Sequence, residues 1–161
     1  MTSIRPLLLA LAALAIAMPA DAQQTPSERL RQLFADDWEA TLRENPTFAT
    51  TVGDRRYNRL LDPVSPADVQ RRVEETRRFL ARLEAIPRDS LTPDERVNYD
   101  IFARNARQGI EEAGLGLHLI PITNREGFHT FFPELGERVP LNNTEDYENY
   151  VARLNAFRDW V

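Results

Sequence analysis

Residues 65–99, SPADVQRRVEETRRFLARLEAIPRDSLTPDERVNY, contain two helix starts of one type. Ser65-Pro66-Ala67-Asp68 and Thr92-Pro93-Asp94-Glu95 each place a hydroxyl residue at the N-cap, Pro at the first helical position and an acid three residues after the cap. Pro87 follows the first of these helices and prevents its continuation. The stretch therefore predicts a helix from Ser65 to about Leu83, a turn, and a second helix from Thr92.

The same helix signals lie on both sides of this stretch. Upstream, Thr25-Pro26-Ser27-Glu28 opens a helix that ends at Asn45-Pro46, and Pro46 opens a short helix closed by Gly53. Downstream, the helix from Thr92 is expected to end at Gly114, and Thr144 to cap a last helix. Apolar residues recur at helical spacing in two of these helices. They are Val97, Ile101, Phe102 and Ile110 in the helix from Thr92, and Tyr147, Tyr150, Val151, Leu154, Phe157, Trp160 and Val161 on the apolar side of the last helix.

Residues 115–143 do not continue this pattern. The run LGLHLIPI at 115–122 is apolar without a clear period, so we expect an irregular, extended segment that could include one short strand. His118 lies inside this run, and we expect it to be buried and neutral with one hydrogen bond. The predicted fold class is all-α, with mostly antiparallel amphipathic helices around the irregular segment, incomplete as a domain.

The N-terminal 22 residues have the form of a secretory signal peptide. Arg5 precedes an apolar run from Leu7 to Met18, and Ala20-Asp21-Ala22 forms an Ala-x-Ala end. A transmembrane helix needs roughly 20 apolar residues, more than this run supplies, and a buried helix would have a polar face. We therefore expect residues 1–22 to be a cleaved signal peptide, residues 23–161 to form the helical portion, and the protein to be periplasmic or secreted without a membrane span.

Composition excludes several function classes for the 161-residue chain. The formal charge of −5 argues against a nucleic-acid partner, which calls for a basic face. The chain has no Cys, which excludes disulfides, thiolate metal sites and a Cys nucleophile. All of the 20 basic residues are Arg, which excludes a Schiff-base Lys.

The residues that could carry chemistry do not form a recognisable set. The two histidines, His118 and His129, are eleven residues apart, unlike the i, i+4 spacing of H-E-x-x-H zinc sites. The serines sit at caps or turns outside any G-x-S-x-G motif. Paired acids such as Glu74-Glu75 lie among arginines and are typical of a solvated face. We assign no catalytic residue, no metal ligand and no cofactor to this chain.

The last helix has no C-terminal stop signal and closes on the large apolar residues Trp160 and Val161. Either these residues tuck under the earlier helices, or further chain covers them. We expect the second, in which this sequence is the front of a longer protein.

Residues from Trp38 onward resemble the N-terminal half of the bacterial domain of unknown function family 885. The resemblance is carried by Trp38-Glu39-Ala40, Pro46-Thr47-Phe48-Ala49-Thr50, Gly53-Asp54-Arg55-Arg56-Tyr57-Asn58, Leu91-Thr92, Glu95-Arg96-Val97-Asn98-Tyr99-Asp100, Pro121, Gly127-Phe128-His129, Thr144-Glu145-Asp146-Tyr147-Glu148-Asn149-Tyr150 and Arg153-Leu154. The resemblance implies an all-helical, exported zinc metallopeptidase of greater length, whose H-E-x-x-H-like helix lies downstream. The present sequence has no His-Glu dipeptide, so no ligand or general base is transferred to it.

Two functions follow as hypotheses. In the first, the chain is the N-terminal fragment of an exported zinc-dependent peptidase-like hydrolase, inactive alone, whose partners are the missing C-terminal part and a peptide substrate. Gly127, Phe128 and His129 would then face the substrate cleft, because their backbone is irregular and aromatic residues follow them. In the second, the chain is a non-enzymatic periplasmic helical interaction or scaffold module.

Overall fold

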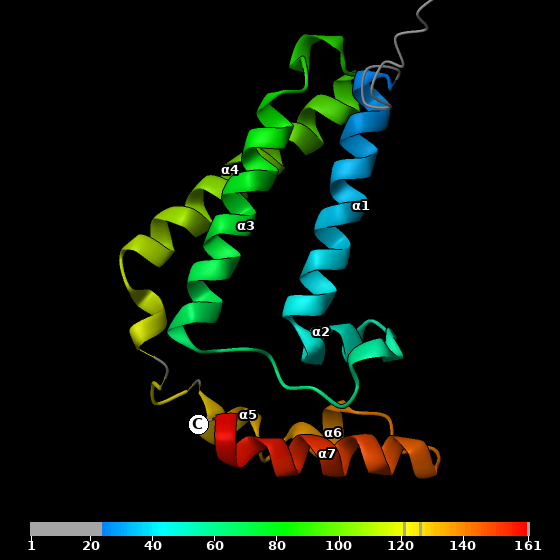
Figure 1. The fold of residues 1–161 in the computed structure, drawn as a ribbon, viewed down its shortest axis with the longest axis vertical. Coiled ribbons are helices and arrows are strands. Elements are labelled where there is room, and N and C mark those ends of the chain that lie inside the picture. The colour runs from blue at the N-terminus through cyan, green and yellow to red at the C-terminus, as the bar shows by residue number, and fades with distance from the viewer. Residues whose placement is uncertain (1–23, 121, 126, 161) are drawn as a thin grey trace, which may run out of the picture.

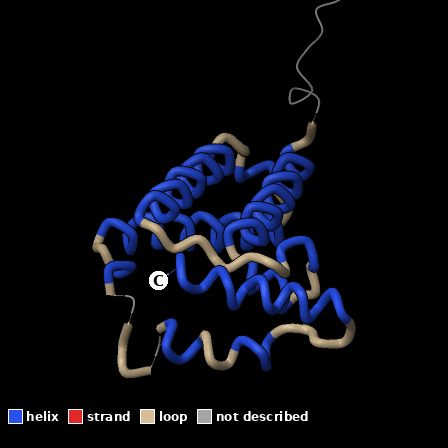
Figure 2. The backbone as a smooth tube through the Cα atoms, turned by 60° about the horizontal axis from the view of Figure 1, so that its bottom comes forward, coloured by secondary structure: helices blue, strands red, loops and turns tan. Residues whose placement is uncertain are grey.

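In a computed structural model of the protein, the structure describes residues 24–120, 122–125 and 127–160. All regular secondary structure in these residues is helical (Figure 2). The longer helices are α1 (Pro26–Glu44), α3 (Pro66–Glu84), α4 (Pro93–Gly114) and α7 (Thr144–Trp160). The shorter ones are α2 (Pro46–Thr51), α5 (Phe128–Phe131) and α6 (Leu135–Arg138), with 3-10 turns η2 (Arg55–Tyr57), η3 (Arg88–Ser90) and η4 (Leu117–Leu119). The all-α fold class is confirmed, whereas the predicted signal peptide lies outside the described residues.

The three capping motifs begin the three longest helices as predicted. Thr25, Ser65 and Thr92 each accept a hydrogen bond from the backbone N–H three residues on, and the acid at that position accepts one from the cap's own backbone N–H. Each reciprocal pair satisfies donors that a helix start otherwise leaves unpaired. The sequence therefore located these helix starts because the signal is local and complete within four residues.

Helices α1, α3 and α4 alternate in direction along the long axis of the molecule (Figure 1). Helix α3 packs against both α1 and α4. The core between them is formed by buried apolar side chains from all three helices and the α3–α4 turn, namely Leu30, Leu33, Ala40, Phe79, Leu83, Ile86, Leu91 and Ala103. Burying such side chains is the main stabilisation of this antiparallel bundle.

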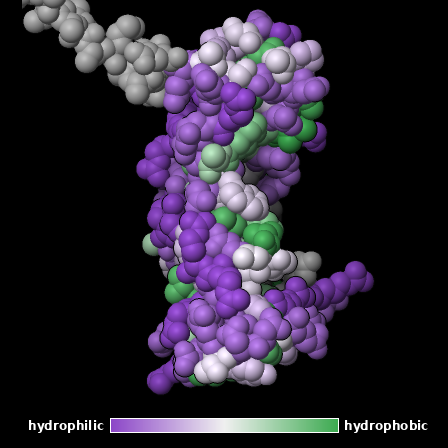
Figure 3. Space-filling model, turned by 90° about the vertical axis from the view of Figure 1, so that its right-hand side faces the viewer, coloured by the Kyte–Doolittle hydropathy of each residue, from purple (hydrophilic) through white to green (hydrophobic). Residues whose placement is uncertain are grey.

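Helices α1, α3 and α4 are called the upright helices, and helices α5, α6 and α7 form a lower layer that lies across one end of them (Figure 1). The long loop that joins η2 to α3 passes between these two parts of the molecule. Seen from the side of α1, the surface is largely hydrophilic, with small hydrophobic areas (Figure 3). No helix in the described residues is both long enough and apolar enough to cross a membrane.

The segment 115–143 differs in part from its prediction. The expected short strand is absent from its described residues, which instead form η4, α5 and α6 between irregular turns. The cap of α7 is Asn143 rather than Thr144, because the Asn143 side chain accepts the backbone N–H of Asp146 at 3.1 Å. Both residues suit an N-cap, and the sequence pattern placed the start one residue late.

The apolar residues that the sequence pattern groups on two helices divide between the interior and solvent. Phe102 of α4 packs against the core, and Phe157 and Trp160 of α7 contact Phe132 and Asp62, whereas other members are exposed. In α7 the buried residues are Asp146, Asn149 and Arg153, which are polar, while Tyr147 is 53% exposed and Val151 50%. This side of α7 is buried because its polar side chains bind partners in distant segments, such as Arg55 for Asp146 and the Pro46 carbonyl for Arg153.

In α4, Ala103 and Ala106 are buried, whereas Val97 and Ile101 are each more than half exposed. The small alanines let α4 approach its neighbours closely, and this turns the larger β-branched residues towards solvent.

Candidate functional site

A pocket of about 680 Å³ lies where the upright helices meet the lower layer. Its wall combines large apolar side chains with three ionisable ones, and consists of Asp62, Val64, Val69, Arg72, His118, Leu119, Gly127, Phe128, Phe131 and Trp160. Pockets of this size and mixed lining are typical of ligand sites. Its volume exceeds those of the hollows between α1 and α3 and between α2 and the α5–α6 segment, which are about 200 and 210 Å³.

Gly127 makes one turn of the pocket wall possible. Its φ of 141° lies in the region that residues with a Cβ rarely adopt, and it immediately precedes α5. Its carbonyl accepts the Thr130 hydroxyl at 2.9 Å and the backbone N–H of Phe131 at 3.0 Å, which fixes the start of α5. Phe128 and Phe131 are thereby positioned in the wall.

Aromatic contacts join α5 to the end of α7. The rings of Phe132 and Phe157 stack with centroids 3.6 Å apart, and Phe157 also lies 6.0 Å from Trp160 and 6.1 Å from Phe128. The indole N–H of Trp160 donates to the backbone carbonyl of Asp62 at 2.6 Å. Trp160 therefore connects α7 to the loop before α3. This contact agrees, for Trp160, with the alternative in which the end of the last helix tucks under earlier parts of the chain.

Two smaller hollows share wall residues with the large pocket. One, of about 200 Å³ between α1 and α3, shares Arg72. The other, of about 210 Å³ between α2 and the α5–α6 segment, shares Phe131 and is also lined by Arg153. Each smaller hollow therefore borders the large pocket at one shared residue, and we call the three together the interlayer groove.

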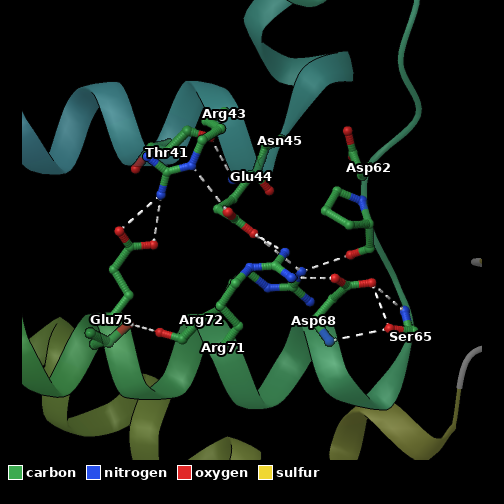
Figure 4. Close-up of polar contacts among 12 residues, drawn as sticks. Thr41, Arg43, Glu44, Asn45, Asp62, Ser65, Asp68, Arg71, Arg72 and Glu75 are labelled. Atoms are coloured by element: carbon green, nitrogen blue, oxygen red, sulfur yellow. Dashed lines mark hydrogen bonds and ion pairs between the residues drawn. The ribbon is translucent and has the colours of Figure 1, made fainter.

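The wall near Arg72 belongs to a charged cluster between α1 and α3 (Figure 4). The buried Glu44 side chain accepts from Arg71 at 2.7 Å and from Arg43 at 3.3 Å, and Arg43 also pairs with Glu75 at 2.9 Å. Burial opposes ionisation of Glu44, but the Arg71 and Arg43 guanidiniums outweigh it and hold the pKa of the Glu44 carboxyl below its ordinary value.

Asp37 lines the hollow between α1 and α3 and has no guanidinium partner within the described part of the chain. Burial, with a smaller contribution from the nearby negative charge of Glu75, raises the pKa of the Asp37 carboxyl above its ordinary value. Among the three acids that line this hollow, the pKa values of Asp37 and Glu44 thus shift in opposite directions, because Glu44 has guanidinium partners and Asp37 has none among the described residues.

The predicted cleft residues separate in the structure. Gly127 and Phe128 line the large pocket, whereas the His129 side chain is exposed outside its lining, with its ring edge-on to Phe128 at 6.2 Å. The burial predicted for His118 is wrong: it is exposed to solvent and lines the pocket mouth. An apolar stretch of sequence suggested a core position, but η4 presents this residue at the surface.

The site residues that the sequence did not reveal come from separate segments. Asp62 lies in a turn-like loop, Arg72 in an arginine-rich helix, and Trp160 at the end of α7. Each residue type is ordinary in its own context, so only the tertiary arrangement brings them into one wall.

The described residues do not fit a zinc site. Within 24–120, 122–125 and 127–160, no three His, Asp or Glu side chains are grouped so that they could hold a metal ion. A zinc site needs three or four such ligands. We therefore derive no zinc-dependent step on this chain.

Comparison with curated proteins and with solved structures found no match to the chain. Residues 46–161, well over half of the sequence, match the family described as "Bacterial protein of unknown function (DUF885)". This span begins at α2 and includes every residue that lines the interlayer groove except those contributed by α1 and Asn45. The chain belongs to the DUF885 family.

Proposed function

We propose that the chain is the N-terminal helical portion of an exported, zinc-dependent peptidase-like hydrolase, in which it supplies a peptide-binding wall and not the metal ligands. The interlayer groove is the observation that carries this proposal. Its three hollows, of about 200, 680 and 210 Å³, adjoin through Arg72 and Phe131. Such a series suits an extended polypeptide, whose successive side chains point to different sides of the backbone.

The lining of the groove fits a peptide better than a sugar or a nucleotide. Phe128, Phe131 and Trp160 offer large apolar surface, and peptides are the class of polymer that carries side chains to fill it. Arg72 and Asp62 stand beside these rings as polar groups that can orient a ligand backbone. The proposal keeps the cleft role for Gly127 and Phe128, which line the pocket, and drops it for His129, whose side chain lies outside the lining.

Exposed apolar stripes on two helices support a further covering layer. Tyr147, Val151 and Leu154 form one stripe on α7, with exposed fractions of 53%, 50% and 38%, and Val97 and Ile101 form another on α4. Contiguous apolar patches of this kind commonly mark interaction sites. We propose that a C-terminal part of the same polypeptide covers them and carries the H-E-x-x-H helix and its zinc.

Export is the second part of the proposal. It rests on the apolar run Leu7 to Met18 followed by Ala20-Asp21-Ala22. Fractionation of the producing cells should recover a form shortened by 22 residues in the periplasm or medium. Recovery of the full-length form in the cytoplasm alone would contradict export.

Intrinsic fluorescence tests peptide binding directly, because one of the two tryptophans lines the pocket. Trp38, the other, stands on α1 edge-on to Phe48. In a Trp38→Phe protein, a peptide of about six residues with one large apolar side chain should shift Trp160 emission saturably. The matched Trp160→Phe protein should show no shift. Absence of a saturable shift in the first protein, or an equal shift in the second, would contradict binding in this pocket.

The exposed α7 stripe also favours a second candidate, a non-enzymatic periplasmic interaction module that binds a separate protein. The two functions differ in what a Val151→Asp, Leu154→Asp double variant should do. A module would lose its partner while peptide binding at Trp160 stays unchanged. A peptidase portion would fail to assemble with an added C-terminal part that contains the H-E-x-x-H helix.

A further inference from the structure

We propose that the large pocket binds the carboxyl end of a peptide, with a bulky apolar last side chain among the aromatic rings and the terminal carboxylate on Arg72. This inference rests on the proposed function, because it names the class of peptide that the interlayer groove takes. It would make the groove selective for free carboxyl termini over internal segments of a chain.

The walls of the large pocket offer an apolar site for the last side chain of a peptide. Phe128, Phe131 and Trp160 face the pocket together with aliphatic residues from α3, the preceding loop and η4. The Phe157 ring, stacked on Phe132 and next to Trp160, holds the aromatic wall from behind. A volume of about 680 Å³ accommodates an aromatic or large aliphatic side chain and the atoms of one or two peptide units.

Arg72 has unused N–H donors that could bind the terminal carboxylate of a peptide. A guanidinium carries five N–H donors in a fork that matches a carboxylate. The Arg72 guanidinium uses Nη1 to donate to the Pro63 carbonyl at 2.7 Å, and its only other interaction with the described residues is the long ion pair to Glu44 at 4.0 Å. Several N–H groups at the pocket edge are therefore available for a ligand.

The acids near Arg72 are already engaged elsewhere. Both carboxylate oxygens of Asp62 accept from Thr47, one from its backbone N–H at 2.8 Å and one from its hydroxyl at 2.7 Å. Glu44 accepts from Arg71 at 2.7 Å, much closer than Arg72 lies to it. Since these acids have nearer partners, an incoming carboxylate is the group that completes the Arg72 fork.

A matched pair of peptides tests this inference. Hexapeptides that end in Phe, one with a free C-terminal carboxylate and one amidated, are titrated into the Trp38→Phe protein while Trp160 emission is recorded. The free acid should bind at least about tenfold more tightly, in the range that a charged, bidentate contact supplies. A Phe-to-Gly change at the last position should weaken the free acid further.

The role of Arg72 is tested in the same assay with Arg72→Gln. Its control is Arg78→Gln. The Arg78 side chain is exposed on α3 and makes no ion pair or hydrogen bond with the described residues. Arg72→Gln should reduce binding of the free acid to the level of the amide, and Arg78→Gln should leave the preference intact.

Equal binding of acid and amide would overturn the carboxylate inference while leaving the peptide site in place. Binding of neither peptide would contradict the proposed function itself. The comparison of acid with amide uses no Arg72 variant, so it decides the question even if Arg72→Gln misfolds.

Discussion

Arg153 of α7 donates a hydrogen bond from Nη2 to the backbone carbonyl of Pro46, the first residue of α2, across 3.0 Å and 107 positions of sequence. The same guanidinium also contacts the carbonyls of Leu60 and Tyr57 and the hydroxyl of Thr50. With only 1% of Arg153 exposed, this is a buried charge that makes its hydrogen bonds to neutral oxygens. Burial lowers the pKa of Arg153, whereas the charge of Asp62 opposes that shift.

Loss of the Arg153 guanidinium should be among the most destabilising single changes in the protein. Arg153→Met keeps most of the side-chain volume but leaves buried carbonyl oxygens without a donor, so we expect a loss of about 3 kcal/mol in the free energy of unfolding. Urea unfolding followed by circular dichroism measures it. Arg158→Met, an exposed position on the same helix, should change stability by less than about 0.5 kcal/mol. Equal effects of the two changes would contradict the buried contact.

The polar side of α7 should matter more for stability than its apolar side. Asp146 is 1% exposed and accepts from Arg55 at 2.6 Å and from the Asn142 backbone N–H at 3.0 Å. We expect Asp146→Leu to cost about 2–3 kcal/mol of unfolding free energy, since donors lose a buried acceptor. Val151→Ser should cost less than about 0.5 kcal/mol in the same urea assay. The reverse order would mean that α7 docks through its apolar side.

These two predictions mark the limit of the sequence pattern. The helix starts at Thr25, Ser65 and Thr92 were predictable because a capping box lies within four residues and needs nothing else. The orientation of α7 was not predictable, because Arg153 and Asp146 find their partners about 90 to 107 positions away. Apolar periodicity indicates which side of a helix could be buried. In α7 the polar contacts of Arg153 and Asp146 determine which side is buried.

Acid should remove the stabilisation that Glu44 provides. Because the pKa of Glu44 in the folded protein is below its ordinary value, its contribution is complete above the ordinary Glu pKa and disappears as the pH falls through the folded-state pKa. Glu44→Gln should cost about 1–2 kcal/mol near pH 7. The difference from wild type should shrink towards about pH 3 in urea titrations. A pH-independent difference would contradict the ionised contact with Arg71.

Asp37 should behave in the opposite way, which makes it an internal control. Its raised pKa means that the folded state disfavours the ionised carboxylate, so its unfavourable contribution appears as the pH rises above the ordinary Asp pKa. Asp37→Asn should therefore raise the free energy of unfolding in urea near pH 7, by no more than about 1 kcal/mol, and have little effect at acidic pH. A destabilised Asn variant at neutral pH would show that Asp37 has a favourable partner.

The α4 cap links two helix starts and can be tested alone. Glu95 accepts the Thr92 backbone N–H at 3.0 Å and the Ser27 hydroxyl of α1 at 2.8 Å. Thr92→Ala should cost about 1 kcal/mol of unfolding free energy, and Thr92→Ser much less because the hydroxyl remains. Glu95→Ala should lower the free energy of unfolding by more than Thr92→Ala, because it also removes the contact with Ser27 of α1.

Only part of the candidate site could be predicted from the sequence. The stretch Gly127-Phe128-His129 stood out through its glycine beside aromatic residues, and two of its three residues line the pocket. Arg72 is one of several arginines along α3, and nothing local distinguishes it from Arg78. The two arginines differ in their surroundings. Arg72 lines the hollow between α1 and α3 and contacts the Pro63 carbonyl, and tertiary packing creates this environment.

Photo-crosslinking can show directly whether the interlayer groove binds an extended peptide. A hexapeptide with a photoreactive phenylalanine analogue at its last position is irradiated with the protein, and the labelled residues are mapped by mass spectrometry. We expect labels on Val69, Phe128, Phe131 or Trp160, and these labels should be suppressed by excess unlabelled peptide. Labels confined to the exposed α7 stripe of Tyr147, Val151 and Leu154 would contradict it.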